Sequence, residues 1–185
     1  MKKFLFSLLT IIATSATVNA QSQFEKGDVS INVNWVMGAS DFDSKCVDNT
    51  MLNGVGLLGE YGFMNVINSK GTISAGVLLG FQAGSTNGVD LSRVRIGTRG
   101  TLHYAFIPQL DTYAGINFLF VDINKAKYEY SADGVKYSDK ETDTDVVAPA
   151  LVAGCRYMVT SFFGVNAEVS WDKYQLVSLG LSFKF

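Results

Sequence analysis

The last ten residues of the chain, 176–185, constrain the fold more than any other stretch. They read Leu-Val-Ser-Leu-Gly-Leu-Ser-Phe-Lys-Phe. Successive side chains of a strand point to opposite faces, so this alternation gives one large apolar face and one small or polar face. The apolar face comprises Val177, Leu179, Leu181, Phe183 and Phe185. Because a tilted strand of about ten residues crosses a bilayer, the segment predicts a membrane-spanning β-strand.

The same alternation recurs along the chain between segments rich in turn residues. The predicted strands lie at about 28–37, 53–63, 71–82, 92–106, 112–121, 146–158, 163–171 and 176–185. Their connections alternate between long and short, and the longest are 38–52 and 122–145. An even strand number with this alternation is typical of an outer-membrane barrel. We therefore expect an all-β fold: an eight-stranded antiparallel up-and-down transmembrane β-barrel, in which the first strand closes on the last.

Composition decides which face points outward. The chain contains 48% hydrophobic and only 17% charged residues, and it has no apolar run long enough for a membrane-spanning helix. Along the predicted strands the second face is mostly Gly, Ser, Asn and Ala. Such a face is a poor exterior for a soluble lipocalin-like barrel, but it fits the narrow interior of eight strands. The pattern therefore favours a membrane barrel with its apolar face outward.

The first residues have the pattern of a secretory signal peptide: Lys2 and Lys3, an apolar stretch at 4–13, and Ala20 before the expected cleavage site. We expect residues 1–20 to be the signal peptide and residues 21–185 to be the barrel domain. Without residues 1–20 the chain carries 13 Lys and Arg against 17 Asp and Glu, a net charge of −4. No basic stripe is present, which argues against a nucleic-acid partner.

Several charged residues fall on the predicted inner face. They are Glu60, Arg95, Arg99, Arg156 and Glu168. A charge inside a narrow barrel is costly unless it is paired. We expect Glu168 to pair with Arg156 across a hairpin, and Glu60 to meet Arg99 or Arg95 across the lumen. Two roles remain open: a structural plug of ion pairs and water, or a gate that opens a thin water path when the carboxylates change partners.

Aromatic residues near the strand ends predict two girdles at the membrane interfaces. The outer girdle contains Trp35 and Trp171, and the inner girdle contains Phe63, Tyr104, Phe106, Phe163 and Phe185. The terms outer and inner follow from the expectation that both mature termini lie in the periplasm.

His103 is the only histidine, so a Ser-His-acid lipid hydrolase would have to use it. It faces the lumen about 11 residues along its strand, which corresponds to a depth of about 28 Å. That depth is near the inner interface, far from outer-leaflet lipid. We therefore expect a hydrogen-bonded interior histidine, no catalytic residue and no enzymatic activity.

The two cysteines, Cys46 and Cys155, are expected to be free thiols. The predicted strand order puts Cys46 in an outer loop and Cys155 near the inner end of a strand, beyond disulfide reach. Two Cys and one His are also too few for a zinc cluster, so we expect no metal site and no cofactor.

Segment 122–145 holds seven acidic residues, four Lys and three Tyr. Its alternating acids allow a divalent cation site, but no EF-hand pattern is present, and a solvated hairpin extension is favoured. Tyr and charge on an exposed segment also suit recognition of a protein or surface ligand. Together with 38–52, it is the main surface available to partners outside the cell.

Three stretches carry a family resemblance: Gly154-Cys155-Arg156-Tyr157, then Gly164-Val165 with Glu168, then 179–185. They resemble the closing strands of small eight-stranded porin-family barrels of the OmpX and OmpA type. The resemblance implies a monomeric outer-membrane barrel with periplasmic termini, a mostly blocked lumen, and contact with outer-membrane lipid and lipopolysaccharide. It also implies that the barrel-insertion machinery reads the end of the chain at Phe183 and Phe185.

In the same family, interior charges of the kind found at Glu60, Arg99, Arg156 and Glu168 form a gate in OmpA-type barrels. The chain ends at Phe185, so the cell-wall anchoring domain of OmpA is not expected. The function predicted from the sequence is a structural or surface-interaction role through the outer loops. The alternative is a small gated low-conductance channel, and a lipid-modifying enzyme is the third possibility.

Overall fold

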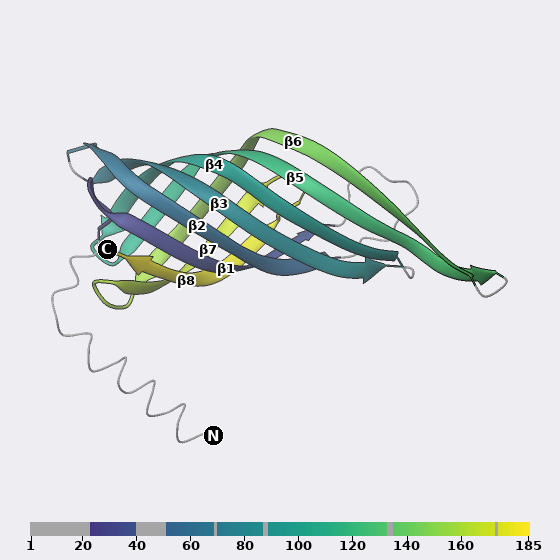
Figure 1. The fold of residues 1–185 in the computed structure, drawn as a ribbon. Helices are drawn as coiled ribbons and strands as arrows, with labels where there is room; N and C mark the ends of the chain where they lie inside the picture. The colour runs from purple at the N-terminus through teal and green to yellow at the C-terminus, as the bar shows by residue number, and fades with distance from the viewer. Residues whose placement is uncertain (1–22, 40–50, 69, 87–88, 133–134, 173) are drawn as a thin grey trace, which may run out of the picture.

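The computed structural model is a closed antiparallel barrel in which every strand pairs with its sequence neighbours and β1 closes on β8 (Figure 1). It describes residues 23–39, 51–68, 70–86, 89–132, 135–172 and 174–185. The strands are β1 Val29–Ala39, β2 Met51–Val66, β3 Gly71–Thr86, β4 Val89–Ile107, β5 Leu110–Ala132, β6 Val135–Met158, β7 Phe163–Trp171 and β8 Val177–Lys184. The predicted fold class is confirmed. The described residues form no helix that is long and apolar enough to cross a membrane.

The barrel is apolar outside and polar inside, which is the reverse of a soluble protein. On the outer face, Val77 is 63% exposed and Ile96 is 55% exposed. On the inner face, Ser30, Asn32 and Ser182 have no exposed surface. This arrangement follows from the two-residue period of the strands, because each strand places its apolar residues on the outer wall.

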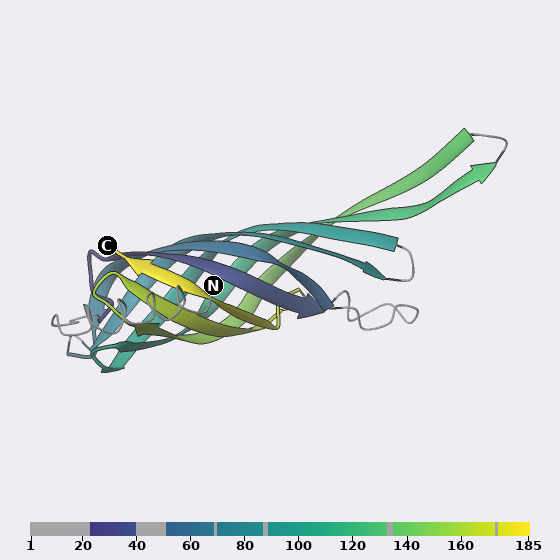
Figure 2. The same ribbon diagram turned by 90° about the horizontal axis from the view of Figure 1, so that it is seen from below.

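The largest difference from the predicted strand bounds lies in β5 and β6. The sequence predicted that these strands end near 121 and begin near 146, whereas their pairing continues outward to Ala132 and Val135. Figures 1 and 2 show this hairpin projecting from the barrel end opposite the C-terminus. The preferred hairpin extension of 122–145 is therefore confirmed, and the predicted strand bounds are wrong. Polar side chains do not end the pairing of these two strands, because their backbone groups still find partners across the hairpin.

Other predicted connections are shorter than expected for the same reason. The predicted turn at 83–91 is largely strand, because β3 runs to Thr86 and β4 starts at Val89. In the predicted loop 38–52, both ends belong to β1 and β2, and residues 40–50 lie outside the described part of the chain. Cys46 lies in that range. Cys155 is a free, half-buried thiol on β6.

A β-bulge in β6 changes which residues face the lumen. Ala150 pairs with Asn117 and Val147 pairs with Leu119, so β6 has one more residue here than β5. The bulge contains Pro149, which has no N–H to donate to the ladder. Because of the extra residue, odd-numbered positions face inward on the distal side of the bulge and even-numbered positions on the other. Asp145 thus comes within reach of the lumen.

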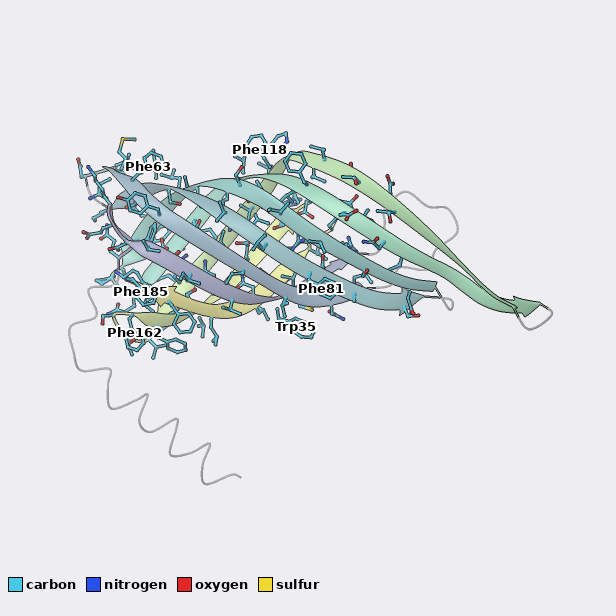
Figure 3. The ribbon with its side chains drawn as sticks, in the orientation of Figure 1. Trp35, Phe63, Phe81, Phe118, Phe162 and Phe185 are labelled. Atoms are coloured by element: carbon cyan, nitrogen blue, oxygen red, sulfur yellow. The ribbon has the colours of Figure 1, made fainter. Side chains whose placement is uncertain are left out.

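Aromatic side chains gather towards both ends of the apolar wall. Figure 3 shows Phe63, Phe162 and Phe185 at the end that carries the C-terminus, with Trp35 and Phe81 nearer the projecting hairpin. Trp35 and Trp171 are 54% and 67% exposed, and Phe106 is 69% exposed. Tyr104 packs edge-on against Phe106, with ring centroids 4.9 Å apart, and Phe163 packs at a tilt against Phe183, with ring centroids 5.6 Å apart. Exposed aromatics in two zones are typical of the two interfaces of a membrane barrel.

Candidate functional site: a sealed lumen with two ion-pair clusters

The first buried cluster, called here the Glu60 cluster, comprises Glu60, His103, Asp111 and Arg156. Arg156 donates from Nη2 to Glu60 Oε2 (3.1 Å) and from Nη1 to Asp111 Oδ2 (3.3 Å). His103 Nδ1 lies 2.9 Å from the same oxygen of Asp111. The four side chains come from β2, β4, β5 and β6 and are at most 2% exposed. Each carboxylate therefore has a cationic or hydrogen-bonding partner, as a buried charge requires.

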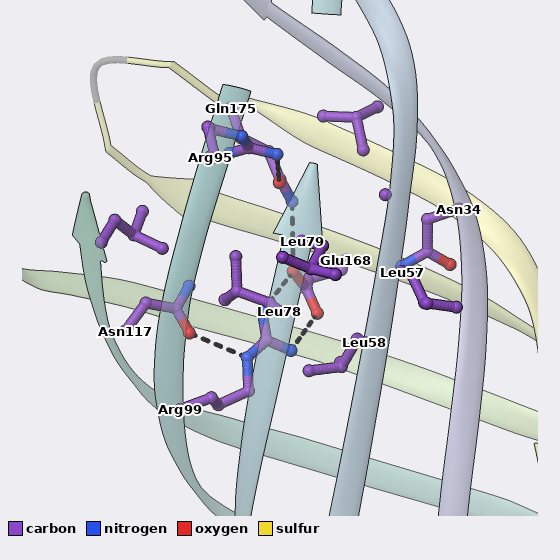
Figure 4. Close-up of a pocket in the computed structure, with 13 residues that line it drawn as sticks. Asn34, Leu57, Leu58, Leu78, Leu79, Arg95, Arg99, Asn117, Glu168 and Gln175 are labelled. Carbon is purple, nitrogen blue, oxygen red and sulfur yellow. Dashed lines mark hydrogen bonds and ion pairs between the residues drawn. The ribbon is translucent and has the colours of Figure 1, made fainter. Parts of the chain in front are cut away.

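The second cluster, called here the Arg99 cluster, is organised by a two-pronged ion pair (Figure 4). Arg99 Nη1 donates to Glu168 Oε2 (2.6 Å) and Nη2 donates to Glu168 Oε1 (2.8 Å). Its Nε donates to Asn117 Oδ1 at 2.8 Å. Glu168 also accepts bonds from Tyr113 Oη and Gln175 Nε2. A planar guanidinium matched to a carboxylate in this way is the strongest ion-pair geometry in proteins.

The two predicted pairings within the charge set are wrong. Glu168 does not pair with Arg156, because the register sets Asn166 opposite Arg156 and Gly154 opposite Glu168. Gly154 has no side chain, and the ring of Tyr113 occupies the space beside it. Glu168 reaches Arg99 on β4, while Glu60 reaches Arg156 instead of Arg99 or Arg95.

Sequence reasoning missed Asp111, because this residue falls between the predicted strands 92–106 and 112–121. The inward parity of Tyr113 and Asn117 extends to position 111, and this alternation was the available signal. Arg95 is buried as predicted but has a different environment from Arg99. It donates from Nη2 to Gln175 Oε1 at 2.7 Å and forms no ion pair with any described residue.

Phe24 closes the lumen at the end that carries the C-terminus. It is 2% exposed, its ring lies 4.6 Å from that of His103, and the Arg156 guanidinium lies 5.4 Å from its centroid. Thr72 Oγ1 donates to the carbonyl oxygen of Phe24 at 2.7 Å, and Lys184 Nζ donates to that of Gln23 at 2.9 Å. The segment before β1 is thus anchored to β3 and β8 and inserts an aromatic ring into the barrel mouth.

Tyr174 covers the lumen at the other end, from the connection between β7 and β8. It is 3% exposed, and its hydroxyl donates to Asp145 Oδ2 at 2.6 Å. The Arg93 guanidinium lies 4.9 Å from the centre of its ring, a cation–π distance. Residue 24 precedes the first predicted strand, and residues 172–175 lie between the last two predicted strands. No alternation covers either segment, so their insertion into the lumen carried no sequence signal.

The only histidine forms a hydrogen-bonded chain that resembles the order of groups in a hydrolase. Ser74 Oγ lies 3.0 Å from His103 Nε2, and His103 Nδ1 lies 2.9 Å from Asp111 Oδ2. Catalysis additionally needs space for a substrate and free amide donors beside the nucleophile. Ser74 is 1% exposed, Phe24 packs on the His103 ring, and the register pairs Ser74 with both Gly62 and Thr101. The geometry is that of an interior polar network, and none of the described cavities opens onto Ser74.

The interior therefore contains buried ion pairs between two aromatic caps, Phe24 and Tyr174, and the outer face of the barrel is apolar. In the described residues, no group of three or more His, Cys, Asp or Glu side chains could hold a metal ion. A closed barrel with this distribution of polarity defines the class of bacterial outer-membrane β-barrels.

Comparison with known families gives the same class. Residues 6–185 match the family model described as the outer membrane protein beta-barrel domain, and the chain belongs to this family. Membership places the protein in the outer membrane. No curated protein matches the chain significantly.

Solved structures with a similar fold are small outer-membrane barrels. Ail, the attachment invasion locus protein of Yersinia pestis, is 15% identical, with 86% of this chain and 99% of that chain covered and a TM-score of 0.53. Ail in complex with the heparin analogue sucrose octasulfate is 14% identical over 86% of this chain and 99% of that chain, with a TM-score of 0.50. The N-terminal β-barrel domain of Pseudomonas aeruginosa OprF is 14% identical, covering 88% and 100%, with a TM-score of 0.48. At these identities the likeness concerns the fold alone.

Proposed function

We propose that this protein is a monomeric, non-enzymatic outer-membrane barrel whose role is surface interaction through the projecting β5–β6 hairpin, together with segment 38–52. One observation carries the proposal: the β5–β6 hairpin continues beyond β4 and β7, the strands that pair with it on either side. Pairing of β5 with β4 ends at Ala126, and pairing of β6 with β7 begins only at Leu151. The barrel serves as the membrane anchor that presents this hairpin.

Among the described residues, no other strand pairs with β5 beyond Ala126 or with β6 before Leu151, so the projecting part has two free strand edges. On β6 the free edge covers residues 135–150, which at about 3.3 Å per residue is roughly 50 Å of strand. A free edge presents unpaired N–H and C=O groups and is a template for an added strand. The partner that suits this edge is an extended peptide segment, which would pair with it as an added strand.

The net charge of the two segments indicates which charge the partner should carry. Segment 122–145 has seven acidic residues against four Lys, and segment 38–52 has three Asp against one Lys. Both surfaces are therefore net negative and favour a neutral or basic partner. The heparin analogue found with Ail is a polyanion, and this chain offers no comparable basic surface on the two segments.

Orientation follows from the same proposal. The C-terminus lies at the barrel end opposite the hairpin (Figure 1), so a hairpin outside the cell leaves both mature termini in the periplasm. The apolar belt then contacts outer-membrane lipid, with lipopolysaccharide on the hairpin side. Phe183 and Phe185 stand at the end that the barrel-insertion machinery would read.

A gated low-conductance channel is the second candidate. The channel is favoured because one lumen carboxylate has several partners among which it could switch. Glu60 accepts hydrogen bonds from Arg156, Thr101 and Ser30, and its Oε1 lies 3.7 Å from His103 Nε2. Rearrangement of such contacts is the kind of change that opens a path. The aromatic caps at Phe24 and Tyr174 weigh against it, because both must move before solute passes.

The experiment compares the refolded mature protein with a variant lacking 127–140, both in lipid nanodiscs. Binding of an array of extended peptides, half basic and half acidic, is measured by interferometry, and conductance is measured in planar bilayers. We expect basic peptides to bind the complete barrel, acidic peptides to bind weakly, and the deletion variant to lose binding while keeping the barrel. Equal binding by the deletion variant would refute the hairpin role, and discrete openings altered by Arg99→Ala or Glu60→Ala would support the channel.

A further inference from the structure

A small cavity lies inside the barrel beside Arg95 (Figure 4). Its volume is about 20 Å³, enough for one small guest. The polar groups around it are Asn34, Arg95, Arg99, Asn117, Glu168 and Gln175. The rest of the wall is apolar, with Val36 and several leucines.

Two glycines create the space. Gly56 on β2 and Gly80 on β3 are paired across the ladder and both face inward. A Cβ at Gly56 would lie 3.0 Å from Val36 Cγ2, and one at Gly80 would lie 3.1 Å from Arg95 Nε. The missing side chains let the Arg95 guanidinium lie against β3 and leave room beside it.

The charge of Arg95 lacks a close counterpart. The side chain is 3% exposed, its Nη2 donates to the neutral amide of Gln175, and its Nε has no partner. The charges that act on it are Asp172, Glu168 and Arg99, but none of the described carboxylates forms an ion pair with it. Glu168 already gives both oxygens to Arg99. A buried guanidinium in this state favours a negative guest, because an uncompensated buried charge is costly.

We propose that this cavity binds a small monovalent anion of the size of chloride, held by Arg95. The site lies inside the part of the barrel that the membrane surrounds, and it is independent of the surface role proposed for the hairpin. The guest balances the charge of Arg95. Water is the competing occupant, since it can accept a hydrogen bond from Arg95 Nε.

The test uses the refolded mature protein in detergent micelles, unfolded by urea at constant ionic strength in mixtures of sodium chloride and sodium gluconate. Gluconate is too large for the cavity. We expect the folding equilibrium constant to rise saturably with chloride, by about tenfold when chloride is at ten times its Kd. Crystals soaked in bromide should show an anomalous peak beside Arg95. Identical unfolding curves in both salts, or no peak, would mean that water fills the site and would overturn the proposal.

Three variants locate the effect. Arg95→Gln should lose the chloride dependence, and Gly56→Ala, which keeps every charge, should weaken it by narrowing the cavity. Lys184→Gln, which removes a cation at the barrel mouth, should keep it. If Lys184→Gln loses the dependence as Arg95→Gln does, general screening explains the effect and the proposal fails. If Arg95→Gln does not fold, Gly56→Ala and the bromide peak still decide the question.

Discussion

The two-pronged pair of Arg99 and Glu168 gives the most direct test of the interior. Glu168→Gln preserves the shape of the side chain but removes its charge. The variant leaves the Arg99 guanidinium, which is 5% exposed, with Asn117 Oδ1 as its remaining acceptor outside position 168. It also sets an amide N–H₂ group against a guanidinium donor, so one of the two short bonds at 2.6 and 2.8 Å is replaced by repulsion.

The expected cost follows from the burial of the pair. Removing one partner of a buried ion pair typically costs about 3–5 kcal/mol, because the other charge stays buried without compensation. The double variant Arg99→Met with Glu168→Leu removes both charges and should recover most of this loss, to within about 2 kcal/mol of the wild type. The coupling energy between the two positions should therefore be at least about 2 kcal/mol.

The free energy of unfolding is measured by urea titration in micelles, followed by the fluorescence of Trp35 and Trp171. The matched control is Asp28→Asn, the same carboxylate-to-amide change in the partly exposed pair of Asp28 with Lys184, whose side chains are 26% and 11% exposed and 3.3 Å apart. Because that pair is partly in solvent, the control should cost about 0–1 kcal/mol. The reasoning is refuted if Glu168→Gln costs no more than Asp28→Asn, or if the double variant is as unstable as the sum of the single variants.

Three further outcomes are expected. Phe24→Ala removes the ring that packs against His103 and should lower the free energy of unfolding by about 3 kcal/mol. Phe162→Ala, at an exposed position on the outer surface, should lower it by less than half of that. Equal losses in the two variants would contradict the capping role of Phe24. Ser74 should remain unlabelled by a fluorophosphonate probe during hours of incubation, and labelling abolished by Ser74→Ala would show instead that the Ser74–His103–Asp111 chain is catalytic. In a Cys46→Ser background, Cys155 on the outer wall should react with an apolar maleimide but not with a charged one in lipid vesicles, and equal labelling by both reagents would place it outside the apolar belt.

The sequence determined the class of fold because a strand has a period of two. In 92–106, for example, the alternation alone assigns Arg95, Arg99 and His103 to one face and Val94, Ile96 and Leu102 to the other. In the structure the first three residues are at most 5% exposed, while Val94, Ile96 and Leu102 are 44–55% exposed. Such an assignment needs no knowledge of the partner strands, since the backbone of each strand imposes it locally.

The tertiary structure decided which charges meet. Whether Glu168 faces Arg156 or Arg99 depends on the register between β6 and β7 and on how far each side chain reaches across the lumen. Neither quantity is local, because the two partners are 69 residues apart in the chain. The sequence therefore predicted the members of the charge set and failed on their pairing.

The same reason explains the caps, the bulge and the hairpin. Phe24 and Tyr174 come from segments without alternation, and only barrel closure brings a mouth within their reach. The change of face at Pro149 depends on one extra residue in β6 relative to β5, which appears only when the two strands are aligned. The polar composition of 122–145 removed it from the predicted membrane strands, but strand pairing beyond the membrane depends on the backbone and not on apolar side chains. Local alternation thus determined the class of fold, and contacts between distant segments decided how the lumen is capped and which hairpin projects from the barrel.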